Sequence, residues 1–252
     1  MEASTVSAAP ILRYDEIDST NAEARRRAEA GEAGPLWITA SRQTAGRGRR
    51  GRAWETGAGN LAATLLISTR KPPVEAAQIA FVTALAVSDL ALAQVPAPLV
   101  TVKWPNDVLV DGAKVSGVLI ESGPCRGGSW LAVGIGANLA TPPVESERPA
   151  TSLADHLRID ITKVMTPDLA LTALAEAFAR HLRVWETYGF TPIRDAWTAR
   201  AHGLGQTCTV RLDHEAFDGI AEGLEADGAL RLRLADGAIR RVTAGDVFFG
   251  GG

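Results

Sequence analysis

Continuous and alternating runs of hydrophobic residues predict a strand-rich first part of the chain. Residues 36–40 and 60–69 are nearly continuous apolar runs of the kind that buried strands show. An Asp-Gly pair at residues 111–112 lies between alternating apolar residues and predicts a tight hairpin. The expected strands lie at residues 11–15, 36–40, 60–69, 99–103, 108–110, 114–122 and 130–139.

Helical spacing of apolar residues and capping sequences predict four helices. The sequence Asp-Ser-Thr-Asn at residues 18–21 offers cap residues to a helix that reaches residue 30. A second helix is expected at residues 75–93, and a short fourth one at residues 192–200. The third begins after Thr-Pro at residues 166–167, and its expected buried face is Leu171, Leu174, Phe178, Leu182 and Trp185.

The pattern changes after residue 205, where only short alternating runs remain. They predict strands at residues 207–212, 219–224, 229–234 and 239–242, joined by Asp-Gly turns. A module of about 45 residues built this way suggests a small barrel that leans on a larger domain. We therefore expect an α+β domain with a mixed, mostly antiparallel sheet at residues 1–203, followed by a β-barrel domain at residues 204–252.

Composition places the chain among ordinary globular proteins. It has 252 residues, 46% of them hydrophobic and 22% charged, with a formal net charge of −3. No apolar run approaches the roughly 20 residues that a membrane span needs, and residues 1–10 read as a frayed tail, not a signal peptide. Cys125 and Cys208 lack metal-type spacing, so two free thiols in a reducing cytoplasm are expected.

The most unusual segment is residues 41–52, which holds five arginines and three glycines and no acidic residue. Such a segment repels itself and contains too much glycine for a stable helix or strand. It predicts a mobile loop whose backbone approaches an anion closely while guanidinium groups surround it. A solvated loop without function is the alternative.

Three further motifs accompany this loop. Ser-Thr-Asn at residues 19–21 stands at a helix start, Lys-Trp-Pro-Asn-Asp at residues 103–107 precedes a strand that begins near Lys114, and Gly-Ile-Gly-Ala-Asn-Leu at residues 134–139 ends another. In this order, and with Gly-Arg-Gly-Arg-Arg-Gly-Arg at residues 46–52, they closely resemble the biotin–protein ligase family. The resemblance covers about residues 14–139, and the C-terminal module also fits it.

The resemblance implies a fold and a reaction. The fold is a class II synthetase-like catalytic domain followed by an SH3-like barrel. Such ligases use ATP and Mg²⁺ to activate biotin as biotinyl-5'-AMP, then transfer biotin to a lysine of a biotin carboxyl carrier protein. Two anions must meet in the first step, so cations and hydrogen-bond donors have to offset their repulsion.

The resemblance also assigns roles to individual residues. Lys114, Arg49 and Arg52 would be catalytic, and Asn106 and Asp107 would hold the metal. Several residues that the resemblance assigns to the site have a simpler explanation from the sequence alone. Ser19 and Thr20 could be helix caps, and Asn106 and Asp107 could form a turn after Pro105. Asn138 could be a turn residue, and Trp54 could simply pack against its neighbours. Biotin would contact Ser19, Thr20, Asn21, Gln43, Gly46, Arg47, Trp54, Lys114 and Gly117. The nucleotide would contact Arg47, Arg49, Arg52, Asn106, Lys114 and Asn138.

The chain departs from the family pattern in two places. Only residues 1–10 precede the first expected strand, so we expect neither a DNA-binding domain nor a repressor function. Residues 148–152 contain no aromatic residue where the family can present one under the adenine. The expected partner is the carrier protein and not DNA or a membrane, the expected location is the cytoplasm, and monomer and homodimer both stay open.

Two alternatives remain at this point. A lipoate–protein ligase has a related fold and adenylate chemistry, although residues 46–52 and 103–107 favour biotin. A nucleic-acid-binding module would use the arginine-rich segment as an arm, which the acidic composition disfavours.

Overall fold

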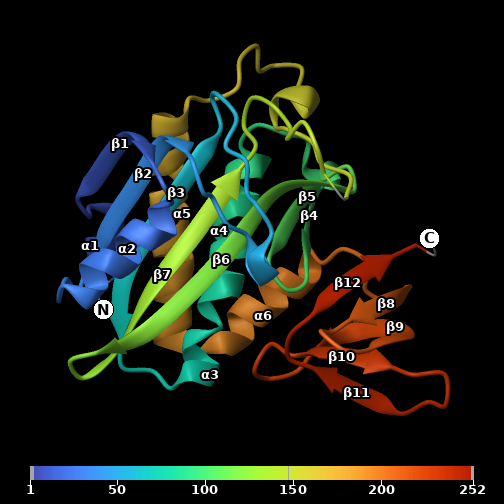
Figure 1. The fold of residues 1–252 in the computed structure, drawn as a ribbon. Helices are drawn as coiled ribbons and strands as arrows, with labels where there is room; N and C mark the ends of the chain where they lie inside the picture. Colours follow the sequence, from blue (N-terminus) through green and yellow to red (C-terminus); the bar gives the residue numbers. More distant parts are fainter. Residues whose placement is uncertain (1–2, 147, 251–252) are drawn as a thin grey trace.

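The computed structural model describes residues 3–146 and 148–250, and within them the chain forms two sheets, the first flanked by helices (Figure 1). The first sheet has the strand order β1-β2-β3-β7-β6-β5-β4. Only β1 and β2 are parallel, so the predicted mixed, mostly antiparallel sheet is confirmed. Its strands are β1 (Ile11–Ile17), β2 (Leu36–Gln43), β3 (Leu61–Thr69), β4 (Val100–Lys103), β5 (Asp107–Val110), β6 (Ala113–Cys125) and β7 (Gly128–Ala137).

Helices cover both faces of this sheet. In Figure 1, α2 (Thr20–Glu29) lies in front of the sheet, and α4 (Ile79–Leu92) and α5 (Pro167–Tyr188) lie behind it. Trp37 of β2 points into the larger hydrophobic cluster with α4 and α5, and its neighbour Ile38 into the smaller cluster with α2. Central strands buried on both faces need apolar residues at every position, which explains the continuous runs in the sequence.

The start of the chain differs from the expectation of a frayed tail, which is wrong for the described residues 3–10. A short helix, α1 (Ala3–Ser7), packs beside α5, and the side chain of Val6 is fully buried. The Trp37 indole N–H donates to the Val6 carbonyl oxygen (3.1 Å). A buried Trp usually satisfies its N–H, and here this segment supplies the acceptor.

The expectation that no segment approaches the length of a membrane span is also wrong. Residues Pro73–Leu92, which contain α3 (Pro73–Ala76) and α4, are long and apolar enough, and 72% of the most apolar window is buried inside the structure. This burial identifies α4 as a core helix, apolar on all sides because sheet and helices surround it.

The second sheet is antiparallel, with the strand order β11-β10-β9-β8-β12. Four of its strands were expected; β12 was missed, and it pairs with β8 along the side that meets the arginine-rich segment. The Trp104 indole N–H donates to the Gly228 carbonyl (3.0 Å), which ties this sheet to the first. The remaining elements are α6 (Phe190–Ala199), β8 (Thr207–Arg211), β9 (Ala216–Leu224), β10 (Leu230–Arg233), β11 (Ile239–Val242) and β12 (Asp246–Phe249).

Candidate active site

A cleft of about 460 Å³ lies between the first sheet, β12 and the arginine loop, by which we mean residues 44–53. Figure 1 shows this loop (blue) in front of β6, on the side toward the second sheet. The site residues expected from the sequence come together here, apart from Gly46, which is buried under the loop backbone. Those that line the cleft are Ser19, Thr20, Asn21, Gln43, Arg47, Arg49, Arg52, Trp54, Asn106, Asp107, Lys114, Gly117 and Asn138.

One end of the cleft is a network of polar groups at the start of α2. The Thr20 backbone N–H donates to Gln43 Oε1 (2.9 Å), and the Thr20 hydroxyl is 3.2 Å from the same oxygen. The Thr64 hydroxyl of β3 lies 2.8 Å from that of Thr20 and 2.7 Å from Asn21 Oδ1. Asn21 Nδ2 donates to Glu121 Oε2 (2.8 Å). A buried network of this kind holds donors and acceptors in fixed positions for a polar ligand.

Ser19 also performs the structural role that the sequence allowed. It is the N-cap of α2, and its hydroxyl accepts from the Ala22 N–H (3.4 Å). Capping and a place in the cleft are compatible, because the hydroxyl oxygen has a second lone pair.

Glycines make room for a flat slot beside this network. A Cβ on Gly136 would lie 2.1 Å from Trp54 Cε2, and a Cβ on Gly117 would lie 3.3 Å from the same indole. The indole therefore packs on the backbone of β6 and β7, and at Gly136 only glycine leaves room for it. Lys114 Nζ is 5.6 Å from the indole centroid. Trp54 packs as the sequence allowed, and it forms a wall of the slot.

The predicted loop is confirmed for residues 44–52, which contain only a short 3-10 helix at Arg49–Gly51, and is wrong for residues 41–43, which are the end of β2. Acidic and carbonyl groups of the second sheet hold the loop. Arg49 donates to Asn106 Oδ1 (3.0 Å) and to the Gly245 carbonyl (3.2 Å), and burial lowers the pKa of its guanidinium. Arg50 pairs with Asp213 and, at 3.1 Å, with Asp246. Arg52 also pairs with Asp246. These groups offset the repulsion among the arginines.

Two buried carboxylates organise the cations of the cleft. Asp107 Oδ1 lies 2.6 Å from Lys114 Nζ, and Asp107 Oδ2 lies 3.8 Å from Arg148 Nη1. Asp246 receives Arg148 Nη2 at 3.3 Å in addition to Arg50 and Arg52. Burial alone would raise the pKa of Asp246, but hydrogen bonds from Arg52 and Arg50 and the charge of Arg148 hold it well below its usual range.

Similarity to known proteins agrees with this arrangement. Residues 15–139 match the Biotin/lipoate A/B protein ligase family, and residues 203–250 match the biotin protein ligase C terminal domain. A biotin--[acetyl-CoA-carboxylase] ligase of Paracoccus denitrificans is 45% identical over 237 residues, which are 93% of this chain and 98% of the relative. The chain belongs to the biotin protein ligase family.

Other members of the family support the same conclusion. A biotin--[acetyl-CoA-carboxylase] ligase of Mycobacterium tuberculosis is 33% identical over 91% of this chain and 85% of its own length. The biotin protein ligase of Aquifex aeolicus, solved in complex with biotin and ATP, superposes with a TM-score of 0.77. It is 27% identical, and the match covers 95% of this chain and 97% of that one.

The two expected metal ligands differ in their fit to Mg²⁺. Asp107 presents a carboxylate to the cleft, whereas the Asn106 side-chain oxygen already accepts from Arg49 and its Nδ2 donates to the Val118 carbonyl (2.6 Å). No group of three or more His, Cys, Asp or Glu residues that could hold a metal ion exists among the described residues. One carboxylate suits Mg²⁺ that is held mainly by substrate phosphates.

Asn138 holds the chain together at the edge of the cleft. Its side-chain amide donates to the Thr151 carbonyl (3.1 Å), and its backbone N–H donates to the Val115 carbonyl (2.8 Å). Asn138 therefore fixes the segment that follows β7 against β6. Asn138 thus has a structural role although it lies in no turn, and its contact with a nucleotide stays a prediction.

Four residues of the site were missed in the sequence: Thr64, Glu121, Arg148 and Asp246. Thr64 lies in a continuous apolar run, where a single threonine gives no signal, and Glu121 ends the Lys114 motif without a partner of obvious chemistry. Arg148 and Asp246 become informative only through their ion pairs with residues far away in the chain.

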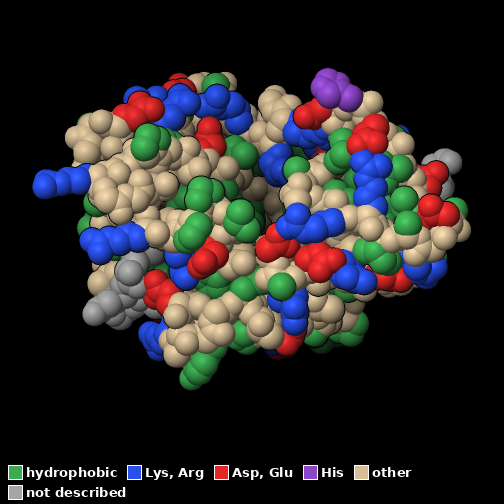
Figure 2. Space-filling view, turned by 90° about the horizontal axis from the view of Figure 1, so that it is seen from below, with side chains coloured by type: hydrophobic (Ala, Val, Ile, Leu, Met, Phe, Trp, Pro, Cys, Tyr) green, Lys and Arg blue, Asp and Glu red, His purple; other side chains and the backbone are tan. Residues whose placement is uncertain are grey.

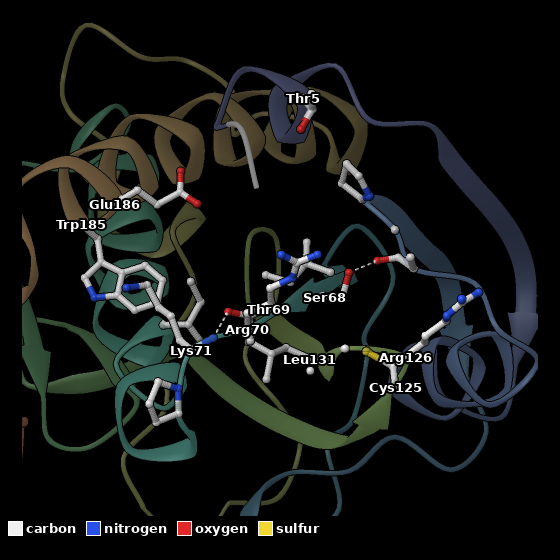
Figure 3. A pocket seen from close by; sticks show the side chains of 18 residues that line it. Thr5, Ser68, Thr69, Arg70, Lys71, Cys125, Arg126, Leu131, Trp185 and Glu186 are labelled. Atoms are coloured by element: carbon white, nitrogen blue, oxygen red, sulfur yellow. Dashed lines mark hydrogen bonds between the residues drawn. The ribbon is translucent and has the colours of Figure 1, made fainter.

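A larger hollow, of about 810 Å³, lies at the opposite end of the sheet near the β6–β7 turn (Figure 3). Arg70, Lys71, Trp185 and Glu186 are among the residues around it. Lys71 is already engaged, since its ammonium lies 3.3 Å from Glu75 and 4.7 Å from the Trp185 ring centroid. None of the expected site residues lines this hollow, so the cleft is the candidate site despite its smaller volume.

The surface also bears on the nucleic-acid alternative. On the face shown in Figure 2, Lys and Arg side chains are interspersed with Asp and Glu side chains and do not gather into one basic surface. A protein that binds nucleic acid through phosphates needs such a surface. The arginines of the loop are instead directed to the cleft and to the second sheet.

Proposed function

We propose that this chain is a biotin–protein ligase. It activates biotin with ATP to form biotinyl-5'-AMP and pyrophosphate, then transfers biotin to a lysine of a biotin carboxyl carrier protein. The observation that carries the proposal is the convergence of five cationic side chains on one cleft next to a glycine-floored slot. These are Arg47, Arg49, Arg52, Lys114 and Arg148.

The slot and its polar network suit biotin. The Thr20 hydroxyl, Asn21 and Gln43 supply fixed donors and acceptors for the ureido group, and Ser19 lies beside them. Trp54, packed on Gly117 and Gly136, provides an apolar wall for the aliphatic tail. A tail that extends along this wall brings the carboxylate toward Lys114, whose ammonium is 5.6 Å from the indole.

The cations of the cleft stabilise the charge that develops in the adenylation step. An oxygen of the biotin carboxylate attacks the α-phosphorus of ATP, the bond to the β,γ-phosphates breaks, and pyrophosphate leaves. Negative charge builds up on the α-phosphoryl oxygens, and fixed cations stabilise that charge most when water is excluded. Lys114 acts at the junction of carboxylate and α-phosphate, and Arg49 and Arg52 act over the adenylate.

Magnesium would bind at Asp107 together with the triphosphate and would neutralise part of the charge of the leaving pyrophosphate. The nearby Lys114 and Arg148 hold this buried carboxylate in place.

In the transfer step the lysine amine of the carrier attacks the acyl carbon, and AMP leaves. The partner is therefore the carrier protein or domain of a biotin-dependent carboxylase. We also propose the boundary between a catalytic domain and a barrel near residues 203 and 204, because β8 opens the second sheet at Thr207. The free thiols Cys125 and Cys208 support a cytoplasmic location.

Two measurements test this function. The protein, incubated with biotin, Mg-ATP and a carrier domain, should label the carrier in a streptavidin blot. Exchange of label between ATP and pyrophosphate should depend on biotin. Exchange that depends on lipoate would contradict the proposal in favour of the lipoate alternative, and no exchange with either acid would refute it.

Replacing Arg49 by glycine is expected to leave the fold intact and to release biotinyl-5'-AMP about ten- to a hundred-fold faster, because a charged hydrogen-bond donor to the adenylate is lost. Rapid gel filtration followed by chromatography of the free adenylate measures the release. Arg42→Gly is the matched control, since Arg42 is exposed and pairs with Glu16 outside the cleft. Equal release by Arg49→Gly and the parent would exclude this role for Arg49.

A further inference from the structure

Glu121 carries the negative charge of the polar network at the start of α2. Thr20 and Asn21 of this network line the cleft, whereas Glu121 and Thr64 are not among the described residues that do. Glu121 is therefore set back from a ligand in the cleft, and any effect that it has on the ligand passes through Asn21. The hydrogen bonds of Asn21 determine what that effect is.

The side-chain amide of Asn21 lies across three neighbouring strands. Gly134 of β7 makes room for it, since a Cβ there would lie 2.1 Å from Asn21 Oδ1. Gly134 is paired with Thr64 of β3 on one side and with Leu119 of β6 on the other. Asn21 Nδ2 donates to Glu121 Oε2 (2.8 Å) and to the Leu119 carbonyl (3.4 Å). Asn21 Oδ1 lies 2.7 Å from the Thr64 hydroxyl, so the amide connects Thr64 to Glu121.

Glu121 fixes the orientation of this amide. A carboxylate and a carbonyl oxygen only accept hydrogen bonds, so the amide nitrogen of Asn21 has to face Glu121 and Leu119. The amide oxygen then faces Thr64, and it also only accepts. The single hydrogen of the Thr64 hydroxyl is therefore donated to Asn21. Both side chains are buried, so bulk water does not compete for this bond.

The Thr20 hydroxyl uses its own hydrogen within the protein as a result. Thr20 Oγ1 lies 2.8 Å from Thr64 Oγ1 and 3.2 Å from Gln43 Oε1. The amide oxygen of Gln43 only accepts, and the Thr64 oxygen can only accept because its hydrogen is donated to Asn21. Whichever of the two receives the hydrogen of Thr20, the group that Thr20 offers to the cleft is a lone pair, which binds a ligand N–H.

We propose that Glu121 is a positioning residue for biotin, because it keeps the Thr20 hydroxyl as an acceptor for an N–H of the ureido group. It acts through Asn21 and Thr64 and not by contact with the ligand. This inference rests on the proposed function, because it concerns the acid that is bound in that reaction. The ureido N–H groups of biotin are donors, whereas the dithiolane ring of lipoate has none. The network therefore favours biotin over lipoate, since a buried acceptor left without a donor costs affinity.

Calorimetric titration with biotin and with ATP tests the role of Glu121. Glu121→Met has a side chain of similar length but no acceptor, so the Asn21 amide can turn over and the hydroxyl hydrogens can reverse. We expect the affinity for biotin to fall by about ten-fold, because the binding-competent arrangement becomes a fraction of the population. The affinity for ATP should stay at the parental value.

Glu121→Gln keeps an acceptor oxygen at the same distance and should bind biotin within about three-fold of the parent. An unchanged biotin affinity in Glu121→Met would overturn the proposal, and so would equal losses in the Met and Gln variants. In exchange assays the loss should appear in the KM for biotin while kcat is unchanged. A lowered kcat at the parental KM would contradict a role in binding.

A double-mutant cycle tests whether the effect passes along the chain of hydrogen bonds. Thr64→Val replaces the hydroxyl by a methyl group at nearly constant volume, and it should also weaken biotin binding by about ten-fold. Without the Thr64 hydroxyl, Glu121→Met should cost nothing further, so the double variant should also be about ten-fold weaker than the parent. A loss of about a hundred-fold in the double variant would show independent effects and overturn the proposal.

Glu23→Met is the matched control, since Glu23 lies on the same helix as Asn21 but pairs with Arg26 and Arg27 away from the cleft. This variant should bind biotin at the parental affinity. A loss equal to that of Glu121→Met would show a general loosening of α2 and overturn the positioning role.

Titration of the parent separates this inference from the proposed function. A parent that does not bind biotin overturns the proposed function and the positioning role with it. A parent that binds biotin, with Glu121→Met indistinguishable from it, overturns the positioning role alone.

Discussion

Replacing Lys114 by alanine is expected to slow biotin-dependent exchange between ATP and pyrophosphate by about 100- to 1,000-fold, the usual effect of removing one fixed donor to developing charge. Lys114 is held at the junction of the slot and the cationic part of the cleft. Its backbone N–H donates to the Pro149 carbonyl (2.8 Å), and its carbonyl accepts from the Thr151 N–H (2.9 Å). The backbone position therefore does not depend on the side chain.

The loss should fall on the chemical step. In the proposed function biotin binds mainly at the Thr20, Asn21 and Gln43 network and at Trp54, so biotin affinity should change by only a few-fold while kcat falls. Removing Lys114 also leaves Asp107 without its nearest cation. Lys114→Gln is therefore the second variant, because it keeps a donor toward Asp107 and removes the charge, and it should show the same loss.

Lys71→Ala is the control, since Lys71 pairs with Glu75 away from the cleft. Initial rates of pyrophosphate exchange, measured with biotin and ATP varied in turn, separate kcat from KM. If Lys114→Gln exchanges at the parental rate, charge at this position has no catalytic role.

The architecture was largely predictable because hydrophobic pattern and burial are directly related. The five apolar residues expected on the face of α5 are all buried, and the four C-terminal strands lie where alternation placed them. The strand β12 was missed because Asp246–Phe249 is too short to alternate visibly. The frayed tail expected at residues 1–10 is wrong for the described residues 3–10, because Val6 packs in the core beside Trp37, and a few small residues give no periodicity.

The candidate site was predictable where a motif is local. Residues 19–21, 46–52, 103–107 and 134–139 each form a short pattern, and the fold brings them to one cleft. Arg148 and Asp246 were not predictable in this way. Arg50 and Asp246, for example, lie 196 residues apart, and nothing in either segment marks the partner. The mobility expected for the arginine loop from its glycines and arginines stays a prediction; in the structure Asp246 pairs with Arg50 and Arg52 of this loop.

Replacing Asp246 by asparagine is expected to release the arginine loop from the second sheet. Asp246 is 4% exposed and pairs with Arg50, Arg52 and Arg148. Breaking a fully buried pair costs about 3–5 kcal/mol, and the partial exposure of the arginines reduces this to about 2 kcal/mol. A protein of this size should then lose about 4–8 °C in Tm. Trypsin should cleave within residues 47–52 up to about 30-fold faster, since local opening follows the same free energy.

The pH dependence of Tm distinguishes the loss of the Asp246 carboxylate from a packing defect. The pKa of Asp246 is depressed in the folded protein below its usual value of 3.8. The carboxylate therefore contributes its full stabilisation above about pH 4 and loses it as the pH falls further, through the depressed pKa. The difference in Tm between parent and Asp246→Asn should be constant near neutral pH and shrink below pH 4.

Asp213→Asn is the matched control, because Asp213 also pairs with Arg50 but its side chain is 76% exposed. The Tm of this variant and the cleavage of its loop should therefore stay near the parental values. If Asp246→Asn and Asp213→Asn behave alike, the buried carboxylate of β12 does not hold the loop.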